Sequence, residues 1–73
     1  MDIKIAVGKR VKELRNKLGI SQEELADIAE LDRTYITSVE CGKRNISIVN
    51  VEKLANALNV SLAMFFEFDY KGE

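Results

Sequence analysis

Polar side chains share one side of a short helix that the sequence predicts to begin at Arg33. Ile36 and Val39, three residues apart, form its apolar side. Burying that side turns Arg33, Thr34 and Thr37 outward. Arginine can bond O6 and N7 of guanine together, and threonine can bond a base edge or touch the thymine methyl group. This pattern is typical of a helix that contacts bases in the major groove of duplex DNA.

A second short helix is expected immediately before it, over residues 22 to 29. Ser21 and Glu24 have the spacing of a capping box, in which each side chain bonds the backbone N–H of the other residue. The residues expected on its buried side are Leu25, Ala26, Ile28 and Ala29. Residues 30 to 32 are too few for a loop and predict a tight turn, with Asp32 capping the next helix. Two short crossed helices joined in this way predict a helix-turn-helix at approximately residues 21–40.

Three further helices complete the expected fold. The first covers roughly residues 3 to 18, where apolar residues recur at helical spacing and Gly19 follows as a C-terminal cap. These apolar residues are Ile3, Val7, Val11, Leu14 and Leu18. Ser47 and Ser61 can each cap a later helix. The expected fold class is therefore all-α, a compact five-helix domain that occupies residues 1–73 as a single unit.

The composition excludes several classes of function. The chain has 73 residues, one cysteine (Cys41) and no histidine. It therefore offers no zinc site, no intrachain disulfide and no histidine for acid–base catalysis, and we expect no enzyme, metal or cofactor. Cys41 is expected to be an ordinary, partly buried thiol. No apolar run is long enough to span a membrane, and the first residues do not form a secretory signal, so a cytoplasmic protein is expected.

Charge is segregated along a chain whose net charge is only −1. Six basic side chains and one acidic one lie between residues 4 and 17, whereas five acidic side chains and no basic one lie between residues 23 and 32. Arg33, Lys43 and Arg44 follow. Such segregation can place a positive face on a nearly neutral molecule.

The stretch from Val7 to Phe66 resembles the Cro and phage-repressor-like helix-turn-helix family, also called XRE-like. The motifs SQEELA, a Tyr-Ile pair, ExGKR and LANALNVS occur in the order typical of that family. LDRTYI followed by GKRNIS is closer still to the controller proteins of restriction–modification systems. The resemblance implies a sequence-specific, double-stranded DNA-binding transcriptional regulator. It further implies a homodimer of five-helix subunits on a pseudo-palindromic operator near its own promoter, where RNA polymerase is a candidate further partner.

The resemblance also assigns roles by position. Arg33, Thr34 and Thr37 would contact bases. The residues that would mainly contact the DNA backbone are Gln22, Tyr35, Ser38, Arg44, Asn45 and Ser47. Lys43 and Arg15 are two further candidates for contacts to the backbone. Two departures from the family pattern matter, at Glu30 and at Ile46. Ile46 stands where many members have proline, which slightly loosens the loop. Glu30 stands where the family favours glycine, so a left-handed backbone there would be strained by about 1–2 kcal/mol. For Tyr35, packing against the turn is as consistent with the sequence as a phosphate contact.

Dimerisation is expected because a chain of this size has a small core and no covalent staple. Four of the five aromatic residues lie near the C-terminus, and helical spacing cannot turn them all to one side. The C-terminal dimerisation region is expected at approximately residues 46–70. The residues from which its interface is expected are Ile48, Val49, Met64, Phe65, Phe66 and Phe68.

Two alternatives stay open at this point. Arg10 and Arg15 on the first helix suit phosphate contacts as well as they suit a solvated helix face. The whole domain also suits an antitoxin-like or other protein-interaction module, because this fold can hold a protein partner instead of DNA. Salt-sensitive binding to duplex DNA separates the two functions, since phosphate contacts release counterions.

Overall fold

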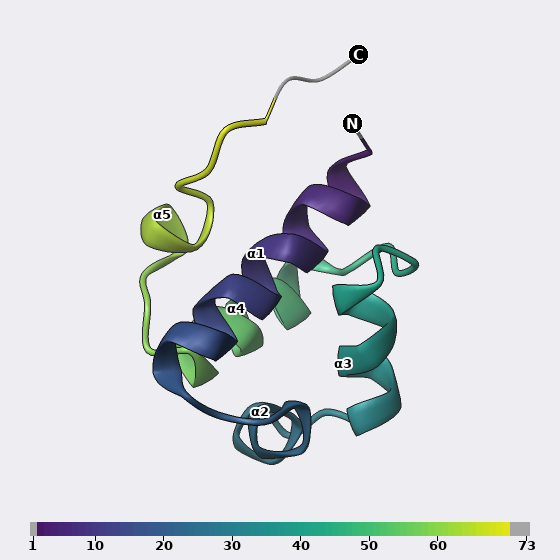
Figure 1. The fold of residues 1–73 in the computed structure, drawn as a ribbon, viewed down its shortest axis with the longest axis vertical. Coiled ribbons are helices and arrows are strands. Elements are labelled where there is room, and N and C mark those ends of the chain that lie inside the picture. Colours follow the sequence, from purple (N-terminus) through teal and green to yellow (C-terminus); the bar gives the residue numbers. More distant parts are fainter. Residues whose placement is uncertain (1, 71–73) are drawn as a thin grey trace.

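The computed structural model describes residues 2–70, which form five α-helices and no strand. The helices are α1 (Ile3–Leu18), α2 (Gln22–Ala29), α3 (Arg33–Glu40), α4 (Ile48–Ala57) and α5 (Leu62–Phe65). The α1 helix crosses in front of α4, while α2 and α3 lie side by side and α5 lies on the opposite side of α1 from α3 (Figure 1). The expected fold class, an all-α five-helix domain with a helix-turn-helix, is confirmed.

Serine caps begin three of the five helices. Ser21 and Glu24 form the expected capping box, with both hydrogen bonds present at 2.9 and 3.0 Å. The hydroxyls of Ser47 and Ser61 accept from the backbone N–H three residues later, as predicted. Asp32 occupies the N-cap position of α3, but its side chain makes no capping bond. Its carboxylate is exposed instead, so water can solvate it.

One core collects the apolar sides of all five helices. Its largest fully buried side chains are Val11, Leu25, Ile36, Val39, Leu54 and Phe65. Ile28 was expected to join them but is 56% exposed. A helix turns by about 100° per residue, so Ile28 lies about 60° from Leu25, on the side away from buried Ala26. Ile3 and Leu18, at the two ends of α1, are also nearly half exposed.

Gly8 allows α1 and α3 to approach each other closely. A Cβ atom at Gly8 would overlap the carbonyl oxygen of Val39 and would lie 3.1 Å from that of Glu40. Both obstacles are backbone atoms, so no side-chain rotation removes the overlap. We therefore predict that Gly8→Ala lowers the free energy of unfolding by about 1–3 kcal/mol, although alanine is the better helix former. Urea denaturation should show this loss, and Asn16→Ala on the exposed side of α1 should show none.

Glu30 ends α2 in the left-handed conformation, with φ 58° and ψ 44°. The strain anticipated from the sequence is therefore present. We predict that Glu30→Gly raises the free energy of unfolding by up to about 1 kcal/mol, because glycine adopts this conformation without a steric penalty. Glu30→Ala removes the same carboxylate but keeps a Cβ atom, so it should give no gain. Equal gains from the two variants, measured by thermal denaturation, would assign the effect to charge rather than to strain.

Candidate nucleic-acid interface

The start of α3 presents polar side chains on a rigid base. Ile36 and Val39 are 0% and 1% exposed, and they pack α3 onto the core. Arg33 and Thr34 consequently lie exposed in the first turn of α3, while Thr37 is half-buried. No ion pair engages Arg33 among residues 2–70. The guanidinium of Arg33 is therefore available to a ligand.

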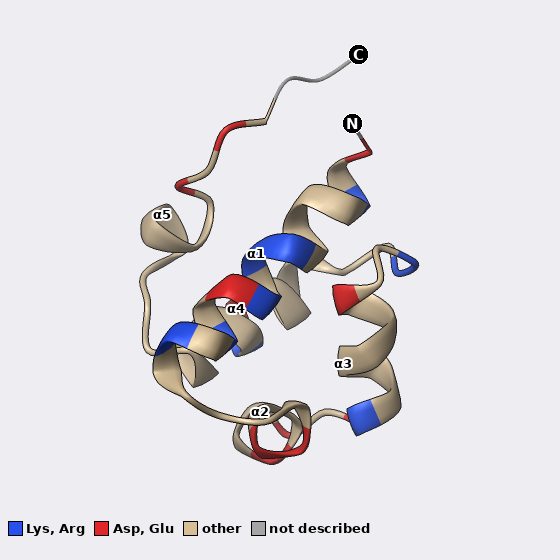
Figure 2. Cartoon of the chain, viewed as in Figure 1, with Lys and Arg blue, Asp and Glu red and all other residues tan. Residues whose placement is uncertain are grey.

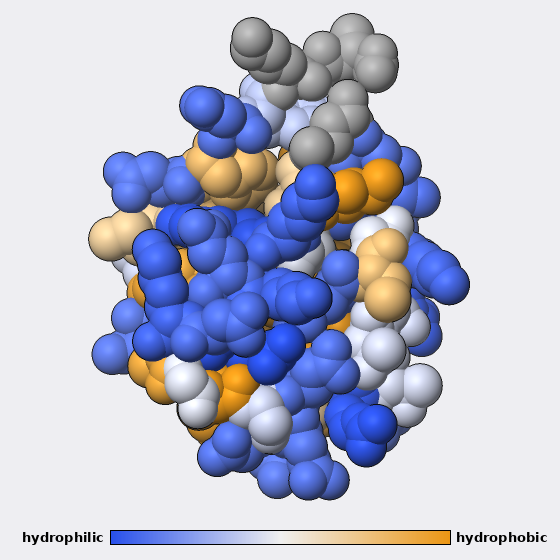
Figure 3. All heavy atoms as spheres, in the orientation of Figure 1, coloured by the Kyte–Doolittle hydropathy of each residue, from blue (hydrophilic) through white to orange (hydrophobic). Residues whose placement is uncertain are grey.

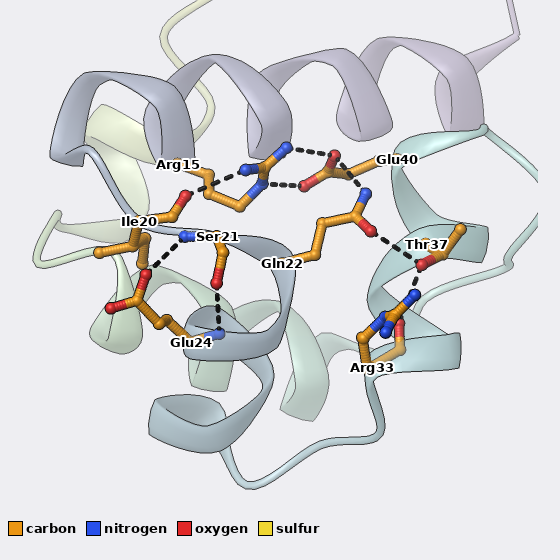
Figure 4. A network of polar contacts seen from close by, with 8 residues as sticks. All are labelled: Arg15, Ile20, Ser21, Gln22, Glu24, Arg33, Thr37 and Glu40. Atoms are coloured by element: carbon orange, nitrogen blue, oxygen red, sulfur yellow. Dashed lines mark hydrogen bonds and ion pairs between the residues drawn. The ribbon is translucent and has the colours of Figure 1, made fainter.

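A polar network joins α1, α2 and α3 behind this surface (Figure 4). Arg15 donates to both carboxylate oxygens of Glu40, with Nε–Oε2 2.7 Å and Nη2–Oε1 3.0 Å, in a bidentate pair. Gln22 then donates from Nε2 to Oε1 of Glu40 at 3.0 Å, and its own Oε1 accepts from the Thr37 hydroxyl at 3.0 Å. The network fixes α2 and α3 relative to α1.

Arg15 is turned into the protein rather than toward solvent. Its side chain is 12% exposed, that of Glu40 is 4% exposed, and Arg15 Nη1 also donates to the Ile20 carbonyl at 3.0 Å. The hydrogen bonds that Arg15 donates to the Glu40 carboxylate raise the pKa of Arg15 above its ordinary value. The structure thus corrects the expected placement of Arg15, because an internal carboxylate and a carbonyl occupy the guanidinium that was expected to contact phosphate.

The loop between α3 and α4 holds the other exposed cations near α3. Lys43, Arg44 and Asn45 are exposed. The Arg44 guanidinium carbon lies 5.1 Å from the centre of the Tyr35 ring, within the range of a cation–π contact. The Tyr35 hydroxyl accepts from Asn50 Nδ2 at 3.1 Å. Tyr35 therefore packs between the loop and α4, and its hydroxyl keeps its own hydrogen for a further acceptor.

The remaining residues predicted to contact the DNA backbone differ in exposure and in how many of their hydrogen-bonding groups are already used within the protein. Ser38 is half-buried on α3. Ser47 is exposed, but its hydroxyl oxygen already caps α4. Gln22 is half-buried with one of its two amide hydrogens bound to Glu40, which leaves the other for a ligand.

Opposite charges occupy neighbouring elements of this surface. Figure 2 shows basic positions along α1, at the start of α3 and in the loop after α3, whereas much of α2 is acidic. Glu23 and Glu24 lie in the first turn of α2, where they suit the helix dipole. The positive charge at Arg33 and Arg44 is therefore local, and it does not follow from the net charge of the chain.

A second surface carries apolar side chains in contact with water. On α4, Ile48 and Val49 are 70% and 59% exposed, and on α5 and just after it Met64 and Phe66 are 47% and 43% exposed. Hydrophobic atoms gather at the margin of the molecule on the side of α5, on a face that is otherwise mainly hydrophilic (Figure 3). Phe68 is half-buried against the core. Four of the six expected interface residues are thus exposed.

Phe65 requires a correction. It is 0% exposed and lies in the core of the same chain, so its side chain is not available to a partner. Its ring meets that of Phe66 edge to face, with centroids 5.0 Å apart. Of the two adjacent aromatic residues, Phe65 therefore belongs to the core and Phe66 to the surface.

Arg10 holds α5 in place, a role the sequence analysis missed. It is only 7% exposed, and its Nε donates to the Phe65 carbonyl at 3.0 Å while Nη2 donates to that of Met64. Nη1 pairs with Glu13 at 2.7 Å and lowers the pKa of that carboxyl. All three guanidinium nitrogens of Arg10 therefore have partners within the protein. Its spacing from Val7 and Leu14 already places it on the apolar stripe of α1, and this signal could have revealed it.

Cys41, which was expected to be partly buried, is exposed, and it belongs to no metal-binding cluster in the described part of the chain. Residues 2–70 contain no group of three histidine, cysteine or acidic side chains arranged to hold a metal ion. No helix in that range has the length and apolar character needed to cross a membrane. The candidate functional site of residues 2–70 is therefore the polar surface formed by α2, α3 and the loop after α3.

Comparisons with known proteins agree with this geometry. Residues 11–65 match the family described as helix-turn-helix. The control protein C.MunI from a Mycoplasma species is 48% identical over 66 residues, which cover 89% of this chain and 89% of that protein. The crystal structure of the restriction–modification controller protein C.AhdI from Aeromonas hydrophila has a TM-score of 0.83 and 46% identity, and the match covers 86% of this chain and 91% of that one.

A third relative was solved together with DNA. The controller protein C.Esp1396I, bound to a 19 base-pair duplex, gives a TM-score of 0.87 at 37% identity, and the match covers 92% of this chain and 89% of that one. The resemblance seen in the sequence is confirmed: this chain belongs to the helix-turn-helix family, in the group that contains the restriction–modification controller proteins.

Proposed function

We propose that this chain is a sequence-specific regulator of transcription that binds duplex DNA as a homodimer. The observation that carries the proposal is the exposed pair Arg33 and Thr34 at the start of α3, held on a base that the Arg15–Glu40 pair makes rigid. Base contacts need side chains at fixed positions, and a helix braced from behind provides them. The relative C.Esp1396I, bound to duplex DNA in its solved structure, supports this assignment.

In the proposed complex each α3 enters a major groove. A two-fold dimer sets its two α3 helices in successive grooves, about 34 Å apart along the duplex. Arg33, Thr34 and Thr37 contact bases. Phosphate and sugar contacts come from the residues around them and set the register. These are Gln22, Tyr35, Ser38, Lys43, Arg44, Asn45 and Ser47. Arg15 acts through Glu40 as a positioning residue.

The homodimer forms, in this proposal, through the exposed apolar side chains of α4 and α5. Ile48, Val49, Met64 and Phe66 belong to this surface, with Phe68 at its edge. Covering them removes apolar area from water, which favours association. C.Esp1396I, a tetramer on its natural 35 base-pair operator, is a relative that assembles on DNA.

The setting we propose is control of a restriction–modification system in the cytoplasm. Controller proteins of such systems match this chain over most of their length. Binding near its own promoter would bring the protein close to RNA polymerase, which is the further partner proposed here.

Selection of binding sites from a random pool of duplexes tests the function directly. The protein should enrich one two-fold-symmetric sequence and should bind it more weakly as salt rises, because each phosphate contact releases counterions. A folded dimer that enriches no sequence would overturn the proposal and would favour the antitoxin-like, protein-binding alternative. A pull-down would then test that alternative.

The proposed dimer interface makes a separate prediction. Ile48→Asp should raise the dissociation constant of the dimer at least about tenfold, equivalent to about 1.4 kcal/mol, because it places a charge in an apolar contact. Ile48 is 70% exposed in the single chain, so the subunit itself should stay folded. Ile28→Asp is the matched control, since Ile28 is also exposed but lies on α2. Sedimentation equilibrium that showed equal effects from both variants would contradict the interface.

A further inference from the structure

The hydroxyl hydrogen of Thr37 points into the protein. Thr37 Oγ1 lies 3.0 Å from Oε1 of Gln22 and 3.1 Å from the carbonyl oxygen of Arg33 (Figure 4). Both neighbours are acceptors, and the hydroxyl has a single hydrogen. Whichever acceptor receives it, this hydrogen is not available to a ligand. A ligand can therefore only donate a hydrogen bond to a lone pair of Oγ1.

The orientation of Gln22 is imposed by the buried ion pair behind it. Arginine has no acceptor and a carboxylate has no donor, so Arg15 and Glu40 can pair in only one sense. Glu40 Oε1 must therefore receive a donor from Gln22, which is Nε2 at 3.0 Å. Turning the amide over would set its oxygen against the carboxylate. The buried guanidinium thus fixes, through Glu40 and Gln22, one of the two acceptors that face the Thr37 hydroxyl.

We infer that Thr37 meets DNA only as a hydrogen-bond acceptor and selects a base with an exocyclic amino group, adenine or cytosine, on the strand it contacts. This inference rests on the proposed function. In the major groove, N6 of adenine and N4 of cytosine are donors, whereas guanine and thymine present acceptors. A phosphate oxygen is also an acceptor, so it does not match Thr37. The second amide hydrogen of Gln22 does suit a phosphate.

The test compares all four bases at every half-site position of the selected operator. At one position in each half-site, wild-type protein should prefer the amino bases over the keto bases on one strand by about fivefold, as expected for one hydrogen bond. Thr37→Val has nearly the same shape but no oxygen, so it should lose that preference and keep all others. Thr34→Val, the matched control on the same helix, should leave the preference at this position intact.

Two further measurements examine the atoms involved. Replacing adenine by purine, or cytosine by 2-pyrimidinone, removes the amino group at this position. Wild-type protein should then bind about fivefold more weakly, whereas Thr37→Val should be unaffected. Gln22→Ala leaves the Arg33 carbonyl as the only acceptor behind the Thr37 hydroxyl, so discrimination between amino and keto bases should weaken. Loss of the Gln22 contact should also lower the affinity for every sequence by one further common factor.

Two results would overturn the inference. One is a preference for keto bases at the position that Thr37→Val relaxes, because Thr37 would then be a donor. The other is an unchanged base profile in Thr37→Val. Full discrimination in Gln22→Ala would support the acceptor role of Thr37 and would assign the orientation of its hydroxyl to the Arg33 carbonyl alone. Wild-type protein that selected no site at all would instead overturn the proposed function.

Discussion

Replacing Glu40 with alanine is expected to lower the free energy of unfolding by about 3–5 kcal/mol, the cost of breaking a buried ion pair from one side. Only 4% of the Glu40 side chain and 12% of the Arg15 side chain are exposed. Alanine leaves the Arg15 guanidinium buried without its carboxylate, and Gln22 also loses its acceptor. A domain of this size has a free energy of unfolding of only about 4–11 kcal/mol, so the variant would be close to unfolding. Chemical denaturation of the purified variant measures the change.

Two control variants separate this effect from a general loss of charge. Glu23→Ala removes an exposed carboxylate from α2 and should change stability by less than about 0.5 kcal/mol. The double variant Arg15→Met with Glu40→Met removes both charges and should recover much of the loss, because no uncompensated ion is left in the interior. If Glu40→Ala were as stable as Glu23→Ala, the pair would not brace the fold.

The helices could be predicted from the sequence because their signals are local. Gly19 and the capping box at Ser21 act within a few residues, and they bound α1 and α2 at the expected places. The burial of Ile36 and Val39 also followed from helical spacing, and it placed Arg33 and Thr34 on the surface. The central part of the candidate site was therefore accessible to sequence reasoning.

What the sequence did not reveal depends on contacts between distant residues. Arg15 meets Glu40 across 25 positions, and Arg10 meets the Phe65 carbonyl across 55. The position of Arg10 on the apolar stripe of α1 indicates its burial, but no local pattern in the sequence indicates the partner of either arginine. The α5 helix has only four residues, so its spacing could not show that Phe65 turns inward. The inward position of Phe65 depends instead on its packing in the core and on the hydrogen bonds that Arg10 donates to α5.

Loss of the Arg33 side chain is expected to separate specific from nonspecific binding. Arg33→Ala should weaken binding to the selected operator by about 1–3 kcal/mol, roughly 5- to 150-fold, because a bidentate contact to guanine is lost. Binding to unrelated duplex DNA should change little, since phosphate contacts from the rest of the surface remain. Titrations on both duplexes, at matched salt, measure the two losses.

Arg44, in the loop after α3, provides the control for the Arg33 prediction. Arg44 is also exposed and cationic, but it lies in the loop after α3, where the proposed contact is to phosphate. Arg44→Ala should therefore weaken binding to both duplexes alike and reduce the slope of log affinity against log salt by about one. Arg33→Lys keeps the charge but not the planar pair of donors, so it should resemble Arg33→Ala in specificity. Equal losses from Arg33→Ala on both duplexes would mean that Arg33 contacts phosphate, and base recognition would then fall to Thr34 and Thr37.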